Sequence, residues 1–192
     1  MTVKTAVRHD AILGGLGGKG VLTIGQLIAE VGLKRFQHVL YLPAHGLFMR
    51  GGLAECSVII SDEKIASLLL SQAEAVLILE PSVLKQFEQR VQPGGILIVE
   101  TAGLKDKVDR KDIKVLPVPG MEIAAAVGDG RTANFVHFGV YLAATRALPL
   151  DLVEQEMEAR FGERANVVKL NREALRQGVA YAQDKLGIKA AG

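Results

Sequence analysis

Short β-rich runs alternate with helical segments up to Pro119, and this alternation restricts the possible folds more than any other feature. The strands that the pattern predicts are Val7–Leu13, His38–Leu42, Ala54–Ile60, Ala75–Leu79, Gly95–Val99 and Ile113–Val118. Helices are predicted between them at Val21–Arg35, Glu63–Ser71 and Ser82–Val91. Because strands that alternate with helices form mainly parallel sheets, we expect an α/β fold with a mainly parallel, Rossmann-like sheet flanked by helices.

Two parts of the chain depart from this alternation. The run Ala54–Ile60 has no convincing helix before it, so we expect it to be antiparallel or to lie at an edge of the sheet. After Pro119 the pattern is helical, with helices predicted at Gly120–Val127, Ala133–Leu148, Asp151–Phe161 and Asn171–Leu186. Asp151 and Asn171 are expected N-caps. Since no long linker frees this helical part, we expect residues 1–192 to form a single domain.

Composition excludes several classes of protein. The 192 residues are 49% hydrophobic, yet the longest apolar runs are far shorter than the ~20 residues that cross a bilayer. We therefore expect a cytoplasmic protein without a membrane partner. The 23 basic and 21 acidic residues are spread along the chain, so no basic stripe indicates nucleic acid as a partner. A single cysteine, Cys56, cannot build a four-cysteine iron–sulfur site, and any cluster must belong to a partner.

A glycine-rich loop follows the first predicted strand and opens the first helix. Its Gly15, Gly17 and Gly20 satisfy G-x-G-x-x-G, with Gly18 and Lys19 between them. Such glycines allow a phosphate to approach backbone N–H groups at a helix N-terminus. The second strand, however, lacks the acidic residue that holds a ribose in NAD-binding proteins. A phosphate site and a purely structural strand-to-helix turn both remain open.

A second loop follows the second strand and contains Arg50, Gly51 and Gly52. Because ligands of open α/β sheets bind at the carboxyl ends of the strands, we expect this loop and the glycine loop to share one edge. Arg50 could bind a carboxylate or phosphate there, or it could form a structural ion pair beside a Gly51-Gly52 turn. Phe48 and Met49 are apolar for a loop and favour a subunit interface.

The remaining polar residues do not predict catalysis or a metal centre. Gly128-Asp129-Gly130 is similar to the metal motif of thiamine diphosphate enzymes, but no strand precedes it and Asn134 is too near, so we expect a turn. The four histidines have no ligand-like spacing. Cys56 lies in an apolar run that favours an inert core thiol. No catalytic residue and no metal ligand is therefore predicted in this chain.

The order of several motifs resembles the gamma subunit family of pyruvate, 2-oxoglutarate and ketoisovalerate ferredoxin oxidoreductases, over about Arg8 to Tyr181. The matching blocks are Gly15-Leu16-Gly17-Gly18-Lys19-Gly20-Val21, Arg50-Gly51-Gly52, Val58-Ile59-Ile60-Ser61-Asp62-Glu63, Pro93-Gly94-Gly95-Ile96-Leu97-Ile98, Val118-Pro119 with Ile123-Ala124, Asn134 with Phe138-Gly139, and Asn171-Arg172-Glu173-Ala174-Leu175-Arg176-Gln177-Gly178. Two positions depart from the family pattern: Lys19 stands where Gln is usual, and Leu47-Phe48-Met49 replaces a more polar stretch.

The resemblance implies a function within a complex. Such complexes decarboxylate a 2-oxoacid on thiamine diphosphate, pass electrons through iron–sulfur clusters to ferredoxin and transfer the acyl group to coenzyme A. It implies that this chain carries none of the cofactors, and that thiamine diphosphate, Mg and the clusters belong to the alpha, beta and, where there is one, delta subunits. Residues Gly15, Gly17, Gly18, Lys19, Gly20, Arg50, Gly51 and Gly52 are then candidates for coenzyme A contact or for a subunit interface.

Two alternatives remain at this stage. One is the beta subunit of indolepyruvate ferredoxin oxidoreductase, in which a similar domain has one large partner chain. The other is a free-standing NAD-binding Rossmann-like oxidoreductase, which the glycine loop permits and the second strand opposes.

Overall fold

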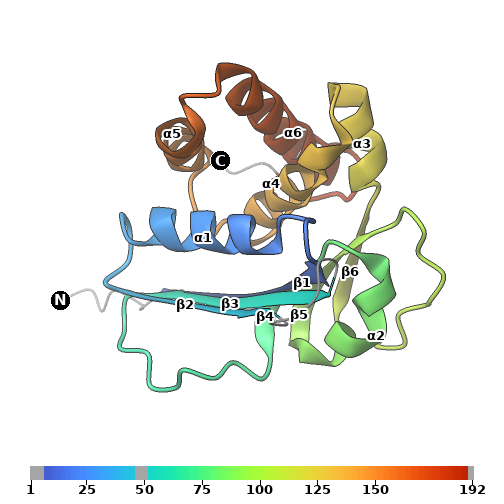
Figure 1. Ribbon diagram of the computed structural model, residues 1–192. Helices are drawn as coiled ribbons and strands as arrows, with labels where there is room; N and C mark the ends of the chain where they lie inside the picture. Colours follow the sequence, from blue (N-terminus) through green and yellow to red (C-terminus); the bar gives the residue numbers. More distant parts are fainter. Residues whose placement is uncertain (1–6, 46–51, 190–192) are drawn as a thin grey trace.

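The computed structural model describes residues 7–45 and 52–189 of the chain (Figure 1). The strands are β1 (Arg8–Leu16), β2 (His38–His45), β3 (Leu53–Ser61), β4 (Ala73–Ile78), β5 (Val91–Glu100) and β6 (Lys114–Val118). The α-helices are α1 (Val21–Gly32), α2 (Leu84–Phe87), α3 (Gly120–Val127), α4 (Ala133–Thr145), α5 (Leu150–Phe161) and α6 (Ala165–Asp184). Short 3-10 helices are η1 (Pro81–Val83), η2 (Glu88–Arg90) and η3 (Gly130–Thr132).

All six strands form one sheet in the order β2-β3-β1-β4-β5-β6. The pairs β1–β4, β4–β5 and β5–β6 are parallel, whereas β3 is antiparallel to both β1 and β2. The predicted α/β fold with a mainly parallel sheet is therefore confirmed, as is the antiparallel direction of β3. Of the two predicted alternatives, the edge position is the one not found, because β2 pairs with β3 from His38 to His45 and is itself the edge strand.

Helices cover the two faces of the sheet unequally. Helix α1 lies along one face, with α3, α4, α5 and α6 stacked on the same side, and α2 lies on the other (Figure 1). The larger core joins Leu13 of β1 and Leu27 of α1 to Val136 of α4 and Leu175 of α6. The smaller core holds Val76 of β4 against Phe87 of α2. The helical C-terminal part therefore packs onto the sheet side that carries α1.

Two glycines set the distance between α4 and α6. A Cβ at Gly139 would lie 2.1 Å from the carbonyl oxygen of Leu175, and one at Gly178 would lie 2.1 Å from that of Val136. Real Cβ atoms do not approach backbone atoms so closely, so only glycine permits the crossing. This contact allows α4 and α6 to pack backbone against backbone.

Several predicted helices differ from the structure. Residues 63–71 contain no helix: the backbone N–H groups of Glu63 and Leu69 donate to the hydroxyls of Ser61 and Ser67, and such local bonds compete with a helix. The segment predicted as Ser82–Val91 is divided into η1, α2 and η2. Its apolar face was predicted correctly, since Val83, Leu84, Phe87 and Val91 are buried.

Both predicted N-caps are wrong. Helix α5 begins at Leu150 with Pro149 as its N-cap, which places Asp151 in the first turn. Helix α6 begins at Ala165, so Asn171 lies inside it and is buried. The exposed residues 165–167 gave no apolar periodicity from which this earlier start could be predicted.

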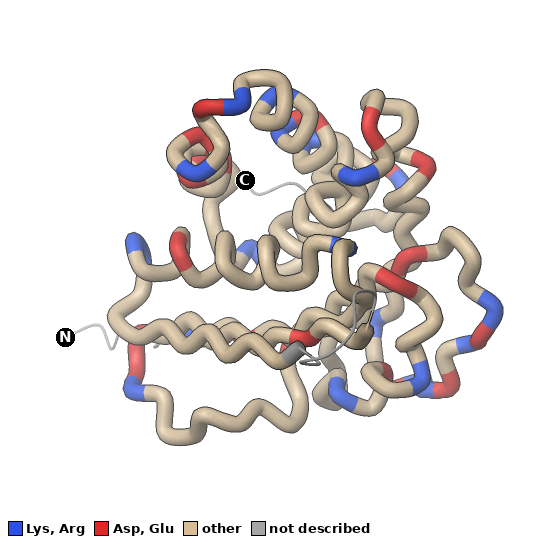
Figure 2. The backbone as a smooth tube through the Cα atoms, viewed as in Figure 1, with Lys and Arg blue, Asp and Glu red and all other residues tan. Residues whose placement is uncertain are grey.

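Charged residues of both signs are interspersed over the helices and loops of the molecule (Figure 2). No helix in the described ranges is long and apolar enough to cross a membrane.

Candidate functional site

The glycine loop connects β1 to α1 by a tight turn. The backbone N–H of Lys19 donates to the carbonyl of Leu16 at 3.1 Å, and Gly18 has a φ of 90°, as the third residue of a type II turn requires. Gly20 is the N-cap of α1 with a φ of 78°. The predicted sequence of strand, turn and helix N-terminus is therefore present at this loop.

The second loop reaches the same edge of the sheet. The N–H of Gly17 donates to the carbonyl of Gly52 at 2.8 Å, because β1 and β3 pair up to Leu16 and Leu53. The expectation that the two loops share one edge is thus confirmed for Gly52. Arg50 and Gly51 lie outside the described residues.

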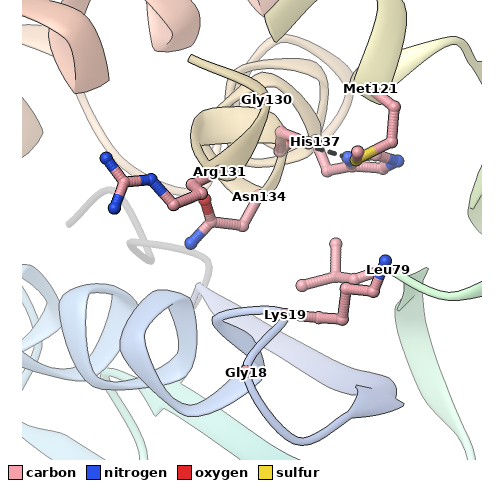
Figure 3. A pocket seen from close by; sticks show the side chains of 9 residues that line it. Gly18, Lys19, Leu79, Met121, Gly130, Arg131, Asn134 and His137 are labelled. Carbon is pink, nitrogen blue, oxygen red and sulfur yellow. Dashed lines mark hydrogen bonds between the residues drawn. The ribbon is translucent and has the colours of Figure 1, made fainter.

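A cavity of about 170 Å³ lies between this loop and the helices above it. Gly18 and Lys19 form its floor, and Asn134 and His137 of α4 face them from above (Figure 3). The lining is completed by Leu79, Met121, Gly130, Arg131 and Ala133. Because α1, α3 and α4 all begin beside the cavity, the positive ends of three helix dipoles converge on it.

Gly20 is required for the close approach of α4 to the start of α1. A Cβ at Gly20 would lie 2.1 Å from Nδ2 of Asn134, so the amide of Asn134 occupies the space above the Cα atom. Gly15, by contrast, lies within β1, and its missing Cβ makes room for Val21. Of the predicted loop residues, Gly18 and Lys19 line the cavity, whereas Gly15, Gly17 and Gly20 shape it.

Both cations at the cavity have acidic partners. Nζ of Lys19 lies 3.1 Å from Oε2 of Glu80, which follows β4. Arg131 is exposed and donates to both carboxylate oxygens of Asp129, which lowers the pKa of that carboxyl. An anion in the cavity would therefore be attracted by the amino ends of the helices. Lys19 or Arg131 would contribute only by leaving its carboxylate partner for the anion.

Asn134 brings an unsatisfied amide to the cavity. Its side chain points toward the glycine loop (Figure 3), and only 8% of the residue is exposed. Oδ1 is buried without a hydrogen-bond partner among the described residues. An unmet buried polar group of this kind costs about 1–3 kcal/mol. This cost makes Asn134 the residue of the site that most needs an explanation.

His137, which lines the cavity, forms a buried pair with Glu100. Nδ1 of His137 donates to the carbonyl of Ala133 at 2.8 Å, and Nε2 lies 3.6 Å from Oε2 of Glu100. Glu100 accepts the backbone N–H groups of Ala102 and Met121, the latter at the start of α3. Burial lowers the pKa of His137, against the opposing effects of the Ala133 hydrogen bond and the Glu100 charge. The imidazole is therefore neutral at neutral pH.

The sequence did not predict these contacts. In the sequence no acidic residue stands at ligand spacing from His137, yet the fold brings Glu100 to it from the end of β5. From the sequence, Asn134 is too near Gly128-Asp129-Gly130 for a metal motif, and it belongs to the block with Phe138-Gly139 that resembles the gamma subunit family. Acidic residues directly after two parallel strands, Glu80 and Glu100, were the available signal for this edge of the sheet.

The turn after α3 and the single cysteine both have structural roles. Gly128, with a φ of 119°, ends α3, and Asp129 caps η3 by accepting the N–H of Arg131, which confirms the predicted turn. Cys56 is fully buried, and burial raises the pKa of its thiol to about 12. Such a thiol is protonated and unreactive at neutral pH. Within the described residues, no group of His, Cys, Asp and Glu side chains could hold a metal ion.

These features define a Rossmann-like α/β domain with a small cavity, suited to an anion, at the carboxyl edge of its sheet. The pyruvate ferredoxin/flavodoxin oxidoreductase family matches residues 10–181, and the chain belongs to this family.

Similar proteins include separate chains and parts of longer ones. Ketoisovalerate oxidoreductase subunit VorA of Methanothermobacter marburgensis is 29% identical over 91% of this chain, which spans 36% of that protein. The gamma subunit of a keto/oxoacid ferredoxin oxidoreductase from Geobacter sulfurreducens is 25% identical with a TM-score of 0.80, over 96% of this chain and 99% of that one.

A third comparison concerns the fold alone. The 2-oxoglutarate:ferredoxin oxidoreductase from Magnetococcus marinus, solved with 2-oxoglutarate, coenzyme A and succinyl-CoA bound, has a TM-score of 0.83 at 20% identity. The alignment covers 92% of this chain and 31% of that one.

Proposed function

We propose that this chain is the gamma subunit of a cytoplasmic 2-oxoacid:ferredoxin oxidoreductase and forms a single domain within that complex. The complex decarboxylates a 2-oxoacid, passes electrons to ferredoxin and transfers the acyl group to coenzyme A. The observation that supports this most is the near full-length likeness to a separate gamma subunit, which matches both chains almost from end to end.

In this proposal the alpha, beta and any delta subunits hold thiamine diphosphate, Mg and the iron–sulfur clusters. The single cysteine of this chain supports the assignment of the clusters to partners. The isolated chain should therefore have no oxidoreductase activity.

The cavity at the glycine loop is the proposed contact with the phosphates of coenzyme A or with the subunit that binds it. Three helix N-termini and Lys19 support an anionic occupant. Lys19 would leave Glu80 for the phosphate when the ligand binds. Gly15, Gly17 and Gly20 shape the loop, and Gly52 joins it to the segment that contains Arg50 and Gly51.

An affinity purification tests the assignment. The tagged full-length chain is isolated from its native cytoplasm, co-purifying proteins are identified, and benzyl viologen reduction is assayed with several 2-oxoacids and coenzyme A. We expect thiamine-binding and cluster-binding subunits and activity that depends on coenzyme A. The variant Arg35→Gln, which removes a cation that lies outside the cavity, is the matched control and should retain this activity.

Two other results would replace the proposal. A single large partner chain with activity toward indolepyruvate would assign the chain to the indolepyruvate oxidoreductases. A solitary chain that binds NAD(H) would assign it to the free-standing oxidoreductases.

A further inference from the structure

Asn171 of α6 is a buried polar residue that lies away from the glycine loop. It is 6% exposed, and its side-chain amide forms no hydrogen bond with any described residue. Neither amide atom belongs to the fully buried atoms without a partner, so both still contact solvent. Asn171 lines a cavity of about 290 Å³ between the first two turns of α6 and η3. The amide therefore faces a space in which a ligand can supply its hydrogen bonds.

The start of α6 carries a cation where helices usually carry an acid or a polar cap. Arg164 is the N-cap residue and lines the same cavity, no side chain caps the first N–H groups, and the first turn contains no acidic residue. Neither Glu163 beside it nor any other described acid forms an ion pair with Arg164. Arg131, on the opposite wall, is already paired with Asp129. Because a cation at this end opposes the helix dipole, the position of Arg164 is explained if an anion binds there.

Arg164 and Asn171 stand on one face of α6. They are seven residues apart, which places them roughly 10 Å from each other along the helix axis. Val167 lies between them on this face and is 38% exposed, and Leu170 lines the cavity beside it. The cavity thus has a positive end, an apolar middle and an amide that can both donate and accept a hydrogen bond.

The amide of Asn171 restricts the class of ligand further. Its Oδ1 is an acceptor, so a bare oxyanion, which has no donor, cannot satisfy it. A ligand that fits both ends carries a carboxylate for Arg164 and an N–H group for Asn171, with an apolar group between them. The carboxyl end of a peptide has this combination of groups.

We propose that this cavity binds the carboxyl end of a peptide whose last residue is apolar. The carboxylate accepts from Arg164 and from the N–H groups that begin α6, and the apolar side chain contacts Val167 and Leu170. The preceding peptide group donates to the amide of Asn171. The inference goes beyond the proposed function, since it concerns another cavity and another class of ligand.

The test titrates the purified full-length chain with N-acetylleucine at constant pH and ionic strength. Nuclear magnetic resonance follows the backbone N–H signals of Ala165 and Asn166, which lie at the start of α6. N-acetylleucinamide, which lacks the carboxylate, should bind at least about tenfold more weakly. Isocaproate keeps the carboxylate and the apolar group but lacks the peptide N–H, and it should bind about two- to fivefold more weakly.

Two variants separate recognition from a structural role. Arg164→Gln should weaken N-acetylleucine at least about tenfold and leave the binding of N-acetylleucinamide unchanged. Asn171→Ala should weaken N-acetylleucine but bind isocaproate like the wild-type chain, because isocaproate has no N–H for the amide. Arg176→Gln removes an arginine of α6 that pairs with Glu154, outside the cavity, and should bind every probe like the wild-type chain.

An N-acetylated tetrapeptide that ends in leucine distinguishes the sources of the carboxylate. Tighter binding than N-acetylleucine indicates the end of a chain, and equal binding indicates that the terminal unit is sufficient; both support the inference. The inference is wrong if neither probe binds, if N-acetylleucinamide binds as well as N-acetylleucine, or if Arg176→Gln is as harmful as Arg164→Gln. Should Asn171→Ala not fold, as its melting curve would show, Arg164→Gln at an exposed residue still decides. Membership of a complex is tested separately, by co-purification.

Discussion

Helices α1 and α4 begin beside one hollow and end beside another, and the two hollows differ in kind. The one at their amino ends measures about 170 Å³ and is the cavity with Asn134 and His137. The one at their carboxyl ends measures about 350 Å³ and is lined by apolar side chains and by Arg35, Arg146 and Lys189. Size and positive charge alone would thus favour the carboxyl-end hollow as a ligand site.

The physical chemistry of helix ends favours the opposite choice. Cations near helix carboxyl ends offset the negative end of the dipole, so the basic residues of the larger hollow have a structural explanation. Arg146, for example, ends α4 and donates to the carbonyl of Lys189. At the amino ends the cations are already paired, yet buried polar atoms lack partners. Among the described residues, the amino-end cavity thus holds polar atoms without partners, whereas the cations of the larger hollow are explained by the helix ends.

The largest effect is expected where α4 crosses α6, between the two hollows. Gly139→Ala would place a Cβ 2.1 Å from the carbonyl oxygen of Leu175 and force the helices apart. We expect a loss of about 3 kcal/mol or more in the free energy of unfolding, measured with urea. Gly130→Ala is the control, because its Cβ would meet nothing closer than 3.7 Å, and it should change stability by about 0.5 kcal/mol or less. Equal losses in both variants would show that the close approach of α4 and α6 is not the reason for glycine at position 139.

A smaller effect is expected at the glycine loop. Gly20→Ala combines a φ of 78° with a Cβ that collides with Asn134, and it should cost about 2–3 kcal/mol. Gly18→Ala has a φ of 90° but open space around its Cβ, and it should cost about 1 kcal/mol. Thermal unfolding of both variants measures the difference, which reports the contact between Asn134 and the loop. If Gly18→Ala were the more damaging, Asn134 would not pack against Gly20.

The sequence predicted the framework of the site better than its lining. The glycines around the end of β1, among them Gly18 in the turn and Gly20 at the start of α1, are a local pattern, so the loop and its place at the sheet edge could be predicted. The contact of Glu100 with His137 depends on how α4 lies across β5, which no local pattern contains. The missing helix at residues 63–71 has a local cause, since the hydroxyls of Ser61 and Ser67 bind the backbone. The spacing of apolar residues alone does not reveal this competition between side-chain hydroxyls and a helix.

The buried pair of the amino-end hollow should make stability depend on pH. Burial lowers the pKa of His137 below the value of about 6.5 in unfolded chains, so between these values the unfolded chain binds more protons. The contribution of neutral His137 to the free energy of unfolding is fully present above about pH 6.5. It is lost as pH falls toward the pKa of His137 in the folded state, by at most about 1.4 kcal/mol per pH unit.

Urea unfolding between about pH 8 and about pH 5 measures this loss. His137→Gln should flatten the dependence, whereas His38→Gln, at the edge strand, should leave it unchanged. An unchanged slope in His137→Gln would show that other groups cause the acid sensitivity.

The smallest effect concerns the charges that face the two hollows. Lys19 is held by Glu80 at 3.1 Å, so Glu80→Gln should free the ammonium group and raise the affinity for pyrophosphate about two- to fivefold. The increase should shrink as salt is added, because screening weakens a partly exposed charge. Arg35→Gln removes a cation from the carboxyl-end hollow and should leave this affinity unchanged. The opposite result would be weaker pyrophosphate binding in Arg35→Gln and no increase in Glu80→Gln. The anion would then bind at the carboxyl-end hollow, where Arg35, Arg146 and Lys189 would have to outweigh the negative ends of two helix dipoles.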